Sequence, residues 1–189
     1  MESDQLSIQL MIDKALAFLK QYEGFTPVAK WDVNAFRIGY GSDTITDANG
    51  NVRYVQINDQ ITIADADRDL KRRVQYEFIP KIKGKIGSDV WNKLPDNTQI
   101  ALISFAYNYG NIVKSAIVNA VKLGNLNNLA DVWITSTYDD NKSLPEKMRN
   151  ALRSRRKKES DLIRSDANKS QSIIVPIVLL IAGTYILLR

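Results

Sequence analysis

Two carboxylates, Glu23 and Asp32, stand nine residues apart in the stretch QYEGFTPVAKWD near the start of the chain. The sequence contains no cysteine and no histidine, which excludes thiol nucleophiles, histidine bases, disulfide scaffolds and the usual zinc ligand sets. Any chemistry must therefore use carboxylates, hydroxyls, amines or tyrosine, and we expect neither a metal nor a cofactor. A structural interpretation stays open, because Glu23 and Gly24 also fit an ordinary helix end with Gly24 as a left-handed cap.

A helix is predicted to carry Glu23 at its end. Apolar residues recur at helical spacing from Ile8 to Tyr22 and form one face, and such a face must be buried. Glu23 follows directly, where the helical pattern stops.

A small antiparallel sheet is predicted beyond Asp32. Residues 36–40 and 44–46 have the composition of strands, and the Asn-Gly pair in DANGN at 47–51 favours a tight hairpin turn. A further strand then begins at Val52.

The remainder of the chain is predicted to be helical. Thr62 is the expected cap of a helix with an acidic first turn, and Pro80 is expected to end that helix. A mostly apolar helix after Pro95 is expected to form the centre of the core. The helices predicted from there on cover residues 94–110, 115–123, 125–136 and 145–165. This order of elements predicts a mainly helical, two-lobed α+β fold.

The chain is basic, with 26 Lys and Arg residues against 21 Asp and Glu residues and a net charge of +5. Such an excess suits an anionic partner but discriminates poorly among partners. The basic run at 153–158 fits a membrane-surface patch, a nucleic-acid patch or the solvated face of a helix, and nearby helical spacing favours the last. No aromatic residue is interleaved with the run, so we expect no binding to nucleic acid.

The last part of the sequence predicts a C-terminal transmembrane helix. Residues from Ile173 to Leu188 are apolar except for Pro176, Gly183, Thr184 and Tyr185. They would span roughly 24 Å as a helix, against a hydrocarbon core of about 30 Å, so flanking residues must contribute. The predicted organisation is a folded domain at 1–165, a polar linker at 166–172 and a membrane anchor at 173–189. A buried core helix is the alternative for this last segment.

Four segments in order carry a resemblance to a known family. They are EGF at 23–25 with Asp32 following, IGYG at 38–41, LPDNTQIALISFAYNYG at 94–110 and LRSRRKKESDLI at 152–163. The chain resembles the phage-type lysozymes of glycoside hydrolase family 24, which include the T-even phage lysozyme. The resemblance covers roughly residues 10–165. It implies a two-lobed lysozyme-like fold and a muramidase that degrades bacterial peptidoglycan.

The resemblance also implies roles for particular residues. Cleavage of a glycosidic bond requires a carboxylic acid that keeps its proton near neutral pH, which partial burial in apolar surroundings achieves. By resemblance this acid is Glu23, and Arg155 is the guanidinium that orients it, with Arg156 adjacent. A second carboxylate must stabilise positive charge on the sugar or activate water, and Asp32 holds the matching position.

The chain departs from the family pattern on both sides of IGYG. The family usually has a threonine before this motif and a histidine after it, whereas this chain has Arg37 and Ser42. Ser42 and Asp43 are therefore auxiliary candidates for the missing groups, although Asp43 fits a hairpin cap equally well. The stereochemical outcome of the reaction is left open by these changes.

Three function classes stay open on the sequence alone. The first is a muramidase that hydrolyses the β-1,4 bond between N-acetylmuramic acid and N-acetylglucosamine. The second is a lytic transglycosylase on the same fold, which needs only Glu23, and the third is a non-catalytic wall-binding virion protein. The expected partners are peptidoglycan and, through the C-terminal helix, a lipid membrane. That membrane belongs either to a lipid-containing phage virion, for entry, or to the host inner membrane, for lysis.

Overall fold

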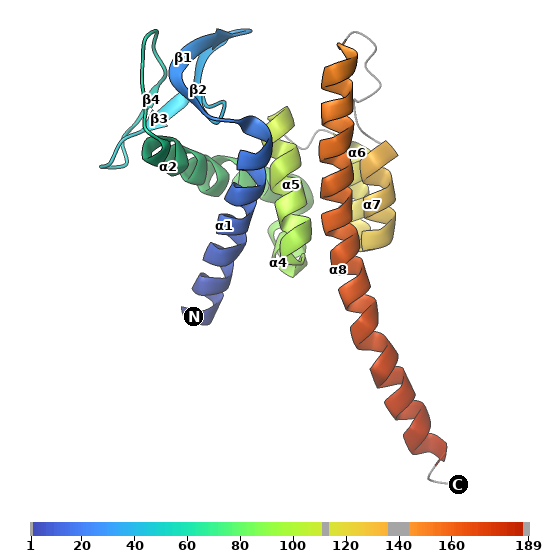
Figure 1. Cartoon of the computed structure of the whole chain (residues 1–189). Coiled ribbons are helices and arrows are strands. Elements are labelled where there is room, and N and C mark those ends of the chain that lie inside the picture. The colour runs from blue at the N-terminus through green and yellow to red at the C-terminus, as the bar shows by residue number, and fades with distance from the viewer. Residues whose placement is uncertain (1, 111–113, 136–143, 187–189) are drawn as a thin grey trace. The chain divides into compact units, whose positions relative to one another are not determined.

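A computed structural model describes the backbone of residues 2–110, 114–135 and 144–186, and the side chains of residues 5–110, 114–135 and 144–169. The chain divides into two compact units, one made of residues 1–91 and 102–113 and the other of residues 92–101 and 114–189. One helix, α5 (Asp96–Tyr109), therefore begins in the second unit and ends in the first (Figure 1).

The first unit combines helices with two β-hairpins, which confirms the predicted mainly helical α+β class. Its remaining elements are α1 (Glu2–Glu23), β1 (Thr26–Asp32), β2 (Ala35–Gly39), β3 (Thr44–Thr46), β4 (Val52–Tyr54), α2 (Ile63–Arg73), the π-helical η1 (Val74–Phe78), α3 (Ile79–Ile86) and α4 (Ser88–Lys93). The strands predicted at 36–40 and 44–46 are confirmed to within one residue at each end.

Helix α1 buries the apolar face that the sequence predicts. The buried residues on this face are Met11, Ile12, Ala15, Leu16 and Leu19. The helix ends at Glu23 because Gly24 has a φ of 63°, a left-handed conformation that glycine adopts without steric cost. The interpretation of Gly24 as a left-handed helix cap is therefore correct.

The strands form two separate two-stranded sheets, β1 with β2 and β3 with β4, where the sequence predicted one small sheet. Strand β1 was not predicted. Its pairing with β2 is irregular between Thr26 and Lys30, where Pro27 has no N–H to donate. This part of β1 instead contacts the loop before α2: the Ala29 N–H donates to the Asp59 carbonyl at 2.8 Å, and the Ile61 N–H donates to the Pro27 carbonyl at 3.0 Å.

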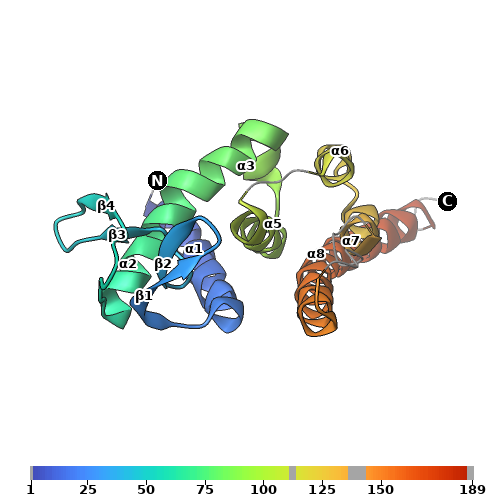
Figure 2. The same ribbon diagram turned by 90° about the horizontal axis from the view of Figure 1, so that it is seen from above.

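Helix α2 begins at the predicted cap but does not end at Pro80. The Asp65 N–H donates to the Thr62 hydroxyl at 3.2 Å and the Thr62 N–H donates to the Asp65 carboxylate at 3.1 Å, a reciprocal capping box. Helices α2, η1 and α3 then follow one continuous helical path (Figure 2) to Ile86. The predicted stop was wrong because Pro80 lies in the first turn of α3, where a missing N–H is tolerated.

The second unit contains the start of α5, then α6 (Ser115–Leu123), α7 (Leu126–Thr135) and α8 (Glu146–Ile186). The helices predicted at 94–110, 115–123 and 125–136 are confirmed to within two residues at each end. Residues 100–106 of α5 are at most 4% exposed. Burial on all sides is typical of a central core helix, as the sequence predicted for this segment.

Helix α8 differs from the organisation predicted for the end of the chain. It continues without a break through residues 166–172, where a polar linker was expected. Asp166 and Ala167 are buried, and Asp166 binds Thr98 at the start of α5 through two hydrogen bonds. The packed part of the second unit therefore extends past residue 165, because Asp166 binds a residue that is distant in sequence.

The side chains of the predicted membrane anchor at 173–189 lie outside the described residues. Among the residues that are described, no helix is both long and apolar enough to span a bilayer.

The basic run at 153–158 is only partly solvated. Arg153, Lys157 and Lys158 are exposed, whereas Arg155 and Arg156 are 4% and 1% exposed. The expectation that most charges of the basic run face solvent therefore holds for Arg153, Lys157 and Lys158, while Arg155 and Arg156 at the centre of the run are buried.

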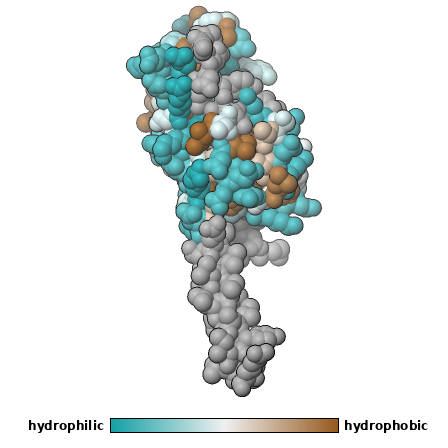
Figure 3. Space-filling model, turned by 90° about the vertical axis from the view of Figure 1, so that its right-hand side faces the viewer, coloured by the Kyte–Doolittle hydropathy of each residue, from teal (hydrophilic) through white to brown (hydrophobic). Residues whose placement is uncertain are grey.

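On the face of the molecule drawn in Figure 3, hydrophilic side chains predominate and hydrophobic ones lie in small separate groups.

Candidate active site

The Glu23 side chain lies beside a tight turn that follows β2. We call residues 39–42 the glycine turn. It is closed by two backbone hydrogen bonds, from the Ile38 N–H to the Ser42 carbonyl at 2.9 Å and from the Ser42 N–H to the Ile38 carbonyl at 3.0 Å. A Cβ atom at Gly41 would lie 4.0 Å from Oε2 of Glu23. The half-buried carboxylate at the end of α1 thus lies close to the glycine turn.

The glycine turn packs directly on α2. Gly39 has a φ of 62°, and a Cβ atom there would lie 3.0 Å from Cβ of Ala66 and 3.1 Å from Cδ1 of Ile61. A larger residue would be strained in its backbone and would also collide with these neighbours. Glycine is therefore required at this position for the turn to approach the helix.

Tyr40 fixes the middle of the glycine turn through both its backbone and its side chain. Its carbonyl accepts a hydrogen bond of 2.5 Å from the Tyr107 hydroxyl on α5. Burial raises the pKa of the Tyr40 phenol, and the Asp67 carboxylate raises it further by accepting its hydrogen bond. Asp67 also pairs with Lys20 on α1, whose ammonium lies 5.4 Å from the centre of the Tyr40 ring. The phenol therefore keeps its proton and binds Asp67 on α2, while Lys20 on α1 lies over the ring.

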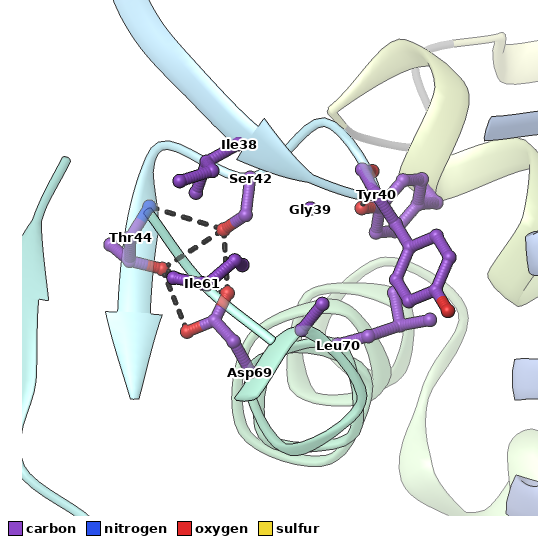
Figure 4. Close-up of a pocket in the computed structure, with 10 residues that line it drawn as sticks. Ile38, Gly39, Tyr40, Ser42, Thr44, Ile61, Asp69 and Leu70 are labelled. Carbon is purple, nitrogen blue, oxygen red and sulfur yellow. Dashed lines mark hydrogen bonds between the residues drawn. The ribbon is translucent and has the colours of Figure 1, made fainter. Parts of the chain in front are cut away.

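Ser42 ends the glycine turn at a buried carboxylate of α2 (Figure 4). Asp69 is 2% exposed and accepts hydrogen bonds from the hydroxyls of Ser42 at 2.6 Å and Thr44 at 3.1 Å. It also accepts from the Thr46 hydroxyl at 2.6 Å. Nη2 of Arg72 lies 3.3 Å from the same carboxylate. These partners satisfy the oxygens of a charged group that would otherwise be costly to bury.

Asp43 lies between two guanidinium groups. Its Oδ1 is 3.7 Å from Nη1 of Arg37 and 3.6 Å from Nη2 of Arg73, and Nη1 of Arg73 also donates to the Ser42 hydroxyl at 3.0 Å. The Asp43 carbonyl accepts from the Val55 N–H at 2.9 Å. Both auxiliary candidates, Ser42 and Asp43, are therefore held by Arg73 from α2.

Asp32 is the last residue of β1, at the tip of the first hairpin, and its side chain is exposed. It pairs with Ala35, while Lys30 pairs with Arg37. Because alternate residues of a strand point to the same face, Lys30, Asp32 and Arg37 share one face of the hairpin. The arginine that replaces the expected threonine thus lies on the same face as the second candidate carboxylate.

Arg155 belongs to the second unit, whereas the other four candidates belong to the first. Its Nε lies 3.4 Å from Oε1 of Glu159. Oε2 of Glu159 binds Nη1 of Arg156 at 2.9 Å and accepts from the Trp133 indole N–H at 2.8 Å. The fully buried Glu159 therefore holds both arginines, and the role of Arg155 in orienting Glu23 stays a prediction.

Sequence reasoning assigned no role to Asp69, Arg72, Arg73 or Glu77, which support the glycine turn. Glu77 accepts from Nη1 of Arg72 at 2.7 Å and from Nε of Arg73 at 3.3 Å. The available signal was the helical spacing of these charges in DRDLKRRVQYE, a pattern that is also typical of a solvated helix face. Within the described part of the chain, no group of three or more acidic side chains is placed to hold a metal ion.

The sequence matches the model of the phage lysozyme family over residues 20–159, a range that includes all five candidate site residues. The chain belongs to the phage lysozyme family. It is a lysozyme, a hydrolase that degrades peptidoglycan, as the resemblance implied. No curated protein matches the sequence significantly.

Solved structures of similar fold include a phage lysozyme and two phage endolysins. A mutant lysozyme of phage P22 is 22% identical, with a TM-score of 0.59 over 79% of this chain and 94% of that chain. The endolysin of Escherichia coli O157:H7 phage FAHEc1 is 23% identical, with a TM-score of 0.53 over 79% and 90% of the two chains. The active form of the P1 phage endolysin Lyz is 16% identical, with a TM-score of 0.57 over 86% and 93%. At these identities the likeness establishes the fold of this lysozyme.

Proposed function

We propose that this lysozyme hydrolyses the β-1,4 bond between N-acetylmuramic acid and N-acetylglucosamine, with Glu23 as the general acid and Asp32 as the second carboxylate. The observation that carries the proposal is the position of Glu23, whose half-buried carboxylate lies beside the glycine turn. Glu23 begins the EGF segment, one of the four segments that carry the family resemblance. Asp32 follows in the same unit, on a solvent-accessible hairpin face.

The two carboxylates act at opposite ends of the same bond. Protonated Glu23 donates its proton to the glycosidic oxygen as the bond from that oxygen to the anomeric carbon breaks. The anomeric carbon gains positive charge, which the ionised carboxylate of Asp32 stabilises. Water then adds to this carbon and loses a proton to solvent, from which Glu23 regains the proton that it donated. The products are a reducing sugar and a free hydroxyl.

The first test replaces Glu23 by glutamine, which keeps the size of the side chain but cannot donate the required proton. We expect clearance of purified peptidoglycan to fall by a factor of roughly 10² to 10⁴, with little change in thermal stability. The matched control is Asp13→Asn, which alters an exposed carboxylate of the same helix. Clearance by Glu23→Gln at a rate near that of the unaltered enzyme would show that Glu23 only ends the helix.

A second variant separates hydrolysis from transglycosylation. Under hydrolysis, Asp32→Asn should lower the rate about as strongly as Glu23→Gln, because the second carboxylate is needed. A transglycosylase, in which the muramic 6-hydroxyl attacks, needs only Glu23 and should tolerate Asp32→Asn much better. Mass spectrometry of the products provides an independent check, since only transglycosylation leaves an anhydro sugar.

We also propose that residues 173–189 attach this lysozyme to a membrane, either that of a lipid-containing phage virion for entry or the host inner membrane for lysis. The support is the apolar sequence from Ile173 to Leu188, since burial of such a segment in lipid is favourable. The intact chain should sediment with liposomes, whereas a chain that ends at residue 169 should not. Equal recovery of both chains in the supernatant would contradict the proposal. Fractionation of virions and infected cells would then separate the entry role from the lysis role.

A further inference from the structure

The Ser42 hydroxyl is held from α2 by two side chains of opposite charge. Its oxygen lies 2.6 Å from the Asp69 carboxylate and 3.0 Å from Nη1 of Arg73. A serine hydroxyl has one hydrogen to donate and lone pairs that accept. The hydrogen therefore points to Asp69 and the guanidinium N–H points to the hydroxyl oxygen, so both partners together fix the orientation of Ser42.

The Arg73 guanidinium is itself fixed by three different partners. Nη1 donates to Ser42, Nη2 lies 3.6 Å from Asp43, and Nε donates to Glu77 at 3.3 Å. Each nitrogen of the planar group thus has its own partner, an arrangement that a lysine ammonium cannot reproduce.

Arg73 also connects the two sides of the glycine turn. Its guanidinium carbon lies 5.6 Å from the centre of the Tyr107 ring, and the Tyr107 hydroxyl donates to the carbonyl of Tyr40. Arg73 therefore contacts Ser42 directly and lies against the residue that binds Tyr40. The π-helical η1 begins at Val74, directly after Arg73. Glu77 in η1 accepts hydrogen bonds from both Arg72 and Arg73. Glu77 therefore keeps both guanidinium groups beside the turn.

We propose that Asp69 and Arg73 are positioning residues for the lysozyme reaction, which act through Ser42 to hold the glycine turn against the Glu23 carboxylate. The inference rests on the proposed role of Glu23. This pair of opposite charges fixes the serine that ends the turn. Because the turn lies beside the proton donor, a displacement of the turn changes the position of the acid relative to the substrate. A misplacement of about 1 Å can lower a rate by roughly a hundredfold.

The test compares variants that release the turn with a variant that loses a similar ion pair elsewhere. Asp69→Asn and Ser42→Ala each alter the charge-assisted hydrogen bond between Ser42 and Asp69. Asp59→Asn is the matched control. Asp59 forms a bidentate ion pair with Arg53, at 2.6 and 3.0 Å, in the same unit but away from the turn. Rates on soluble peptidoglycan fragments are divided by the folded fraction from circular dichroism, so that a loss of stability alone does not change the result.

We expect Asp69→Asn and Ser42→Ala each to lower kcat by roughly tenfold to a hundredfold, with KM changed by less than about twofold. Asp59→Asn should leave both constants unchanged. The double variant with both changes should be no slower than Asp69→Asn alone, because Asp69 acts through Ser42. Arg73→Lys should also lower kcat, since it keeps the charge but not the three-way contact.

An unchanged kcat for folded Asp69→Asn, or a loss in Asp59→Asn as large as that in Asp69→Asn, would overturn the inference. If Asp69→Asn does not fold, Ser42→Ala decides the question alone, because a wild-type kcat there would show that Asp69 and Arg73 do not act through Ser42. Failure of the proposed function is distinguished by Glu23→Gln, which would then retain activity whatever the result for Asp69.

Discussion

A chain that ends at residue 165 should be markedly less stable than one that ends at residue 169. The shorter chain loses Asp166, whose Oδ2 accepts hydrogen bonds from the Thr98 N–H at 2.8 Å and from the Thr98 hydroxyl at 2.9 Å. Asp166 is 4% exposed and Thr98 is fully buried. Thr98 is the third residue of α5, so its N–H has no partner within the helix. Asp166 therefore caps α5 from a different helix.

The size of the loss follows from these contacts. A hydrogen bond to a charged group contributes about 1.5 to 3 kcal/mol, and a carboxylate near a helix N-terminus contributes up to about 2 kcal/mol in a buried position. Since the contributions overlap at one oxygen, we expect the free energy of unfolding to fall by about 3 to 5 kcal/mol. For a protein of this size each kcal/mol lowers Tm by about 2 to 4 °C, so Tm should fall by about 6 to 20 °C.

Thermal unfolding followed by circular dichroism measures this effect in chains 1–165 and 1–169. Asp166→Ala within chain 1–169 should reproduce most of the loss. Asp161→Asn is the control, because Asp161 is exposed and pairs with the exposed Lys157 at 2.9 Å, and exposed pairs contribute little. Equal melting temperatures for chains 1–165 and 1–169 would refute the argument that Asp166 caps α5.

Two further predictions concern the first unit. Hydrogen bonds from Thr62 and the nearby Arg68 lower the pKa of Asp65 from 3.8 to about 2, so its stabilising contribution is present above about pH 4 and is lost as the pH falls towards 2. Asp65→Asn should therefore flatten the dependence of unfolding free energy on pH in that range, as measured by urea titration. Gly39→Ala should cost more stability than Gly50→Ala, although both glycines have positive φ, because only Gly39 has atoms within 4 Å of the added Cβ. Equal losses in urea titrations would show that backbone strain alone sets the cost.

The parts of the fold that could be predicted from the sequence depend on residues close together in the chain. The end of α1 follows from an apolar pattern and Gly24, and the turn between β3 and β4 follows from its Asn-Gly pair. The position of Glu23 at a helix end is local in the same sense. Such features need no knowledge of what packs against them.

The parts that could not be predicted depend on contacts between residues far apart in the sequence. Strand β1 is completed by bonds to the loop that contains Asp59 and Ile61, which no local pattern reveals. The contact of Ser42 with Asp69 spans 27 residues, and that of Thr98 with Asp166 spans 68. Before the partner is known, an aspartate on a polar helix face or in a polar segment is indistinguishable from a solvated one.

Because α5 is divided between the two units, the order in which the chain is synthesised decides when each unit can complete its contacts. The ribosome releases residues 1–91 before Tyr107, which contacts the Phe78 ring at 5.1 Å and donates to the carbonyl of Tyr40. The beginning of the same helix lacks its cap until Asp166 has been added 68 residues after Thr98. Domains generally fold as units, N-terminal first, during synthesis. In this chain, however, the glycine turn beside Glu23 reaches its final set of contacts only after a helix that also belongs to the later unit has been made.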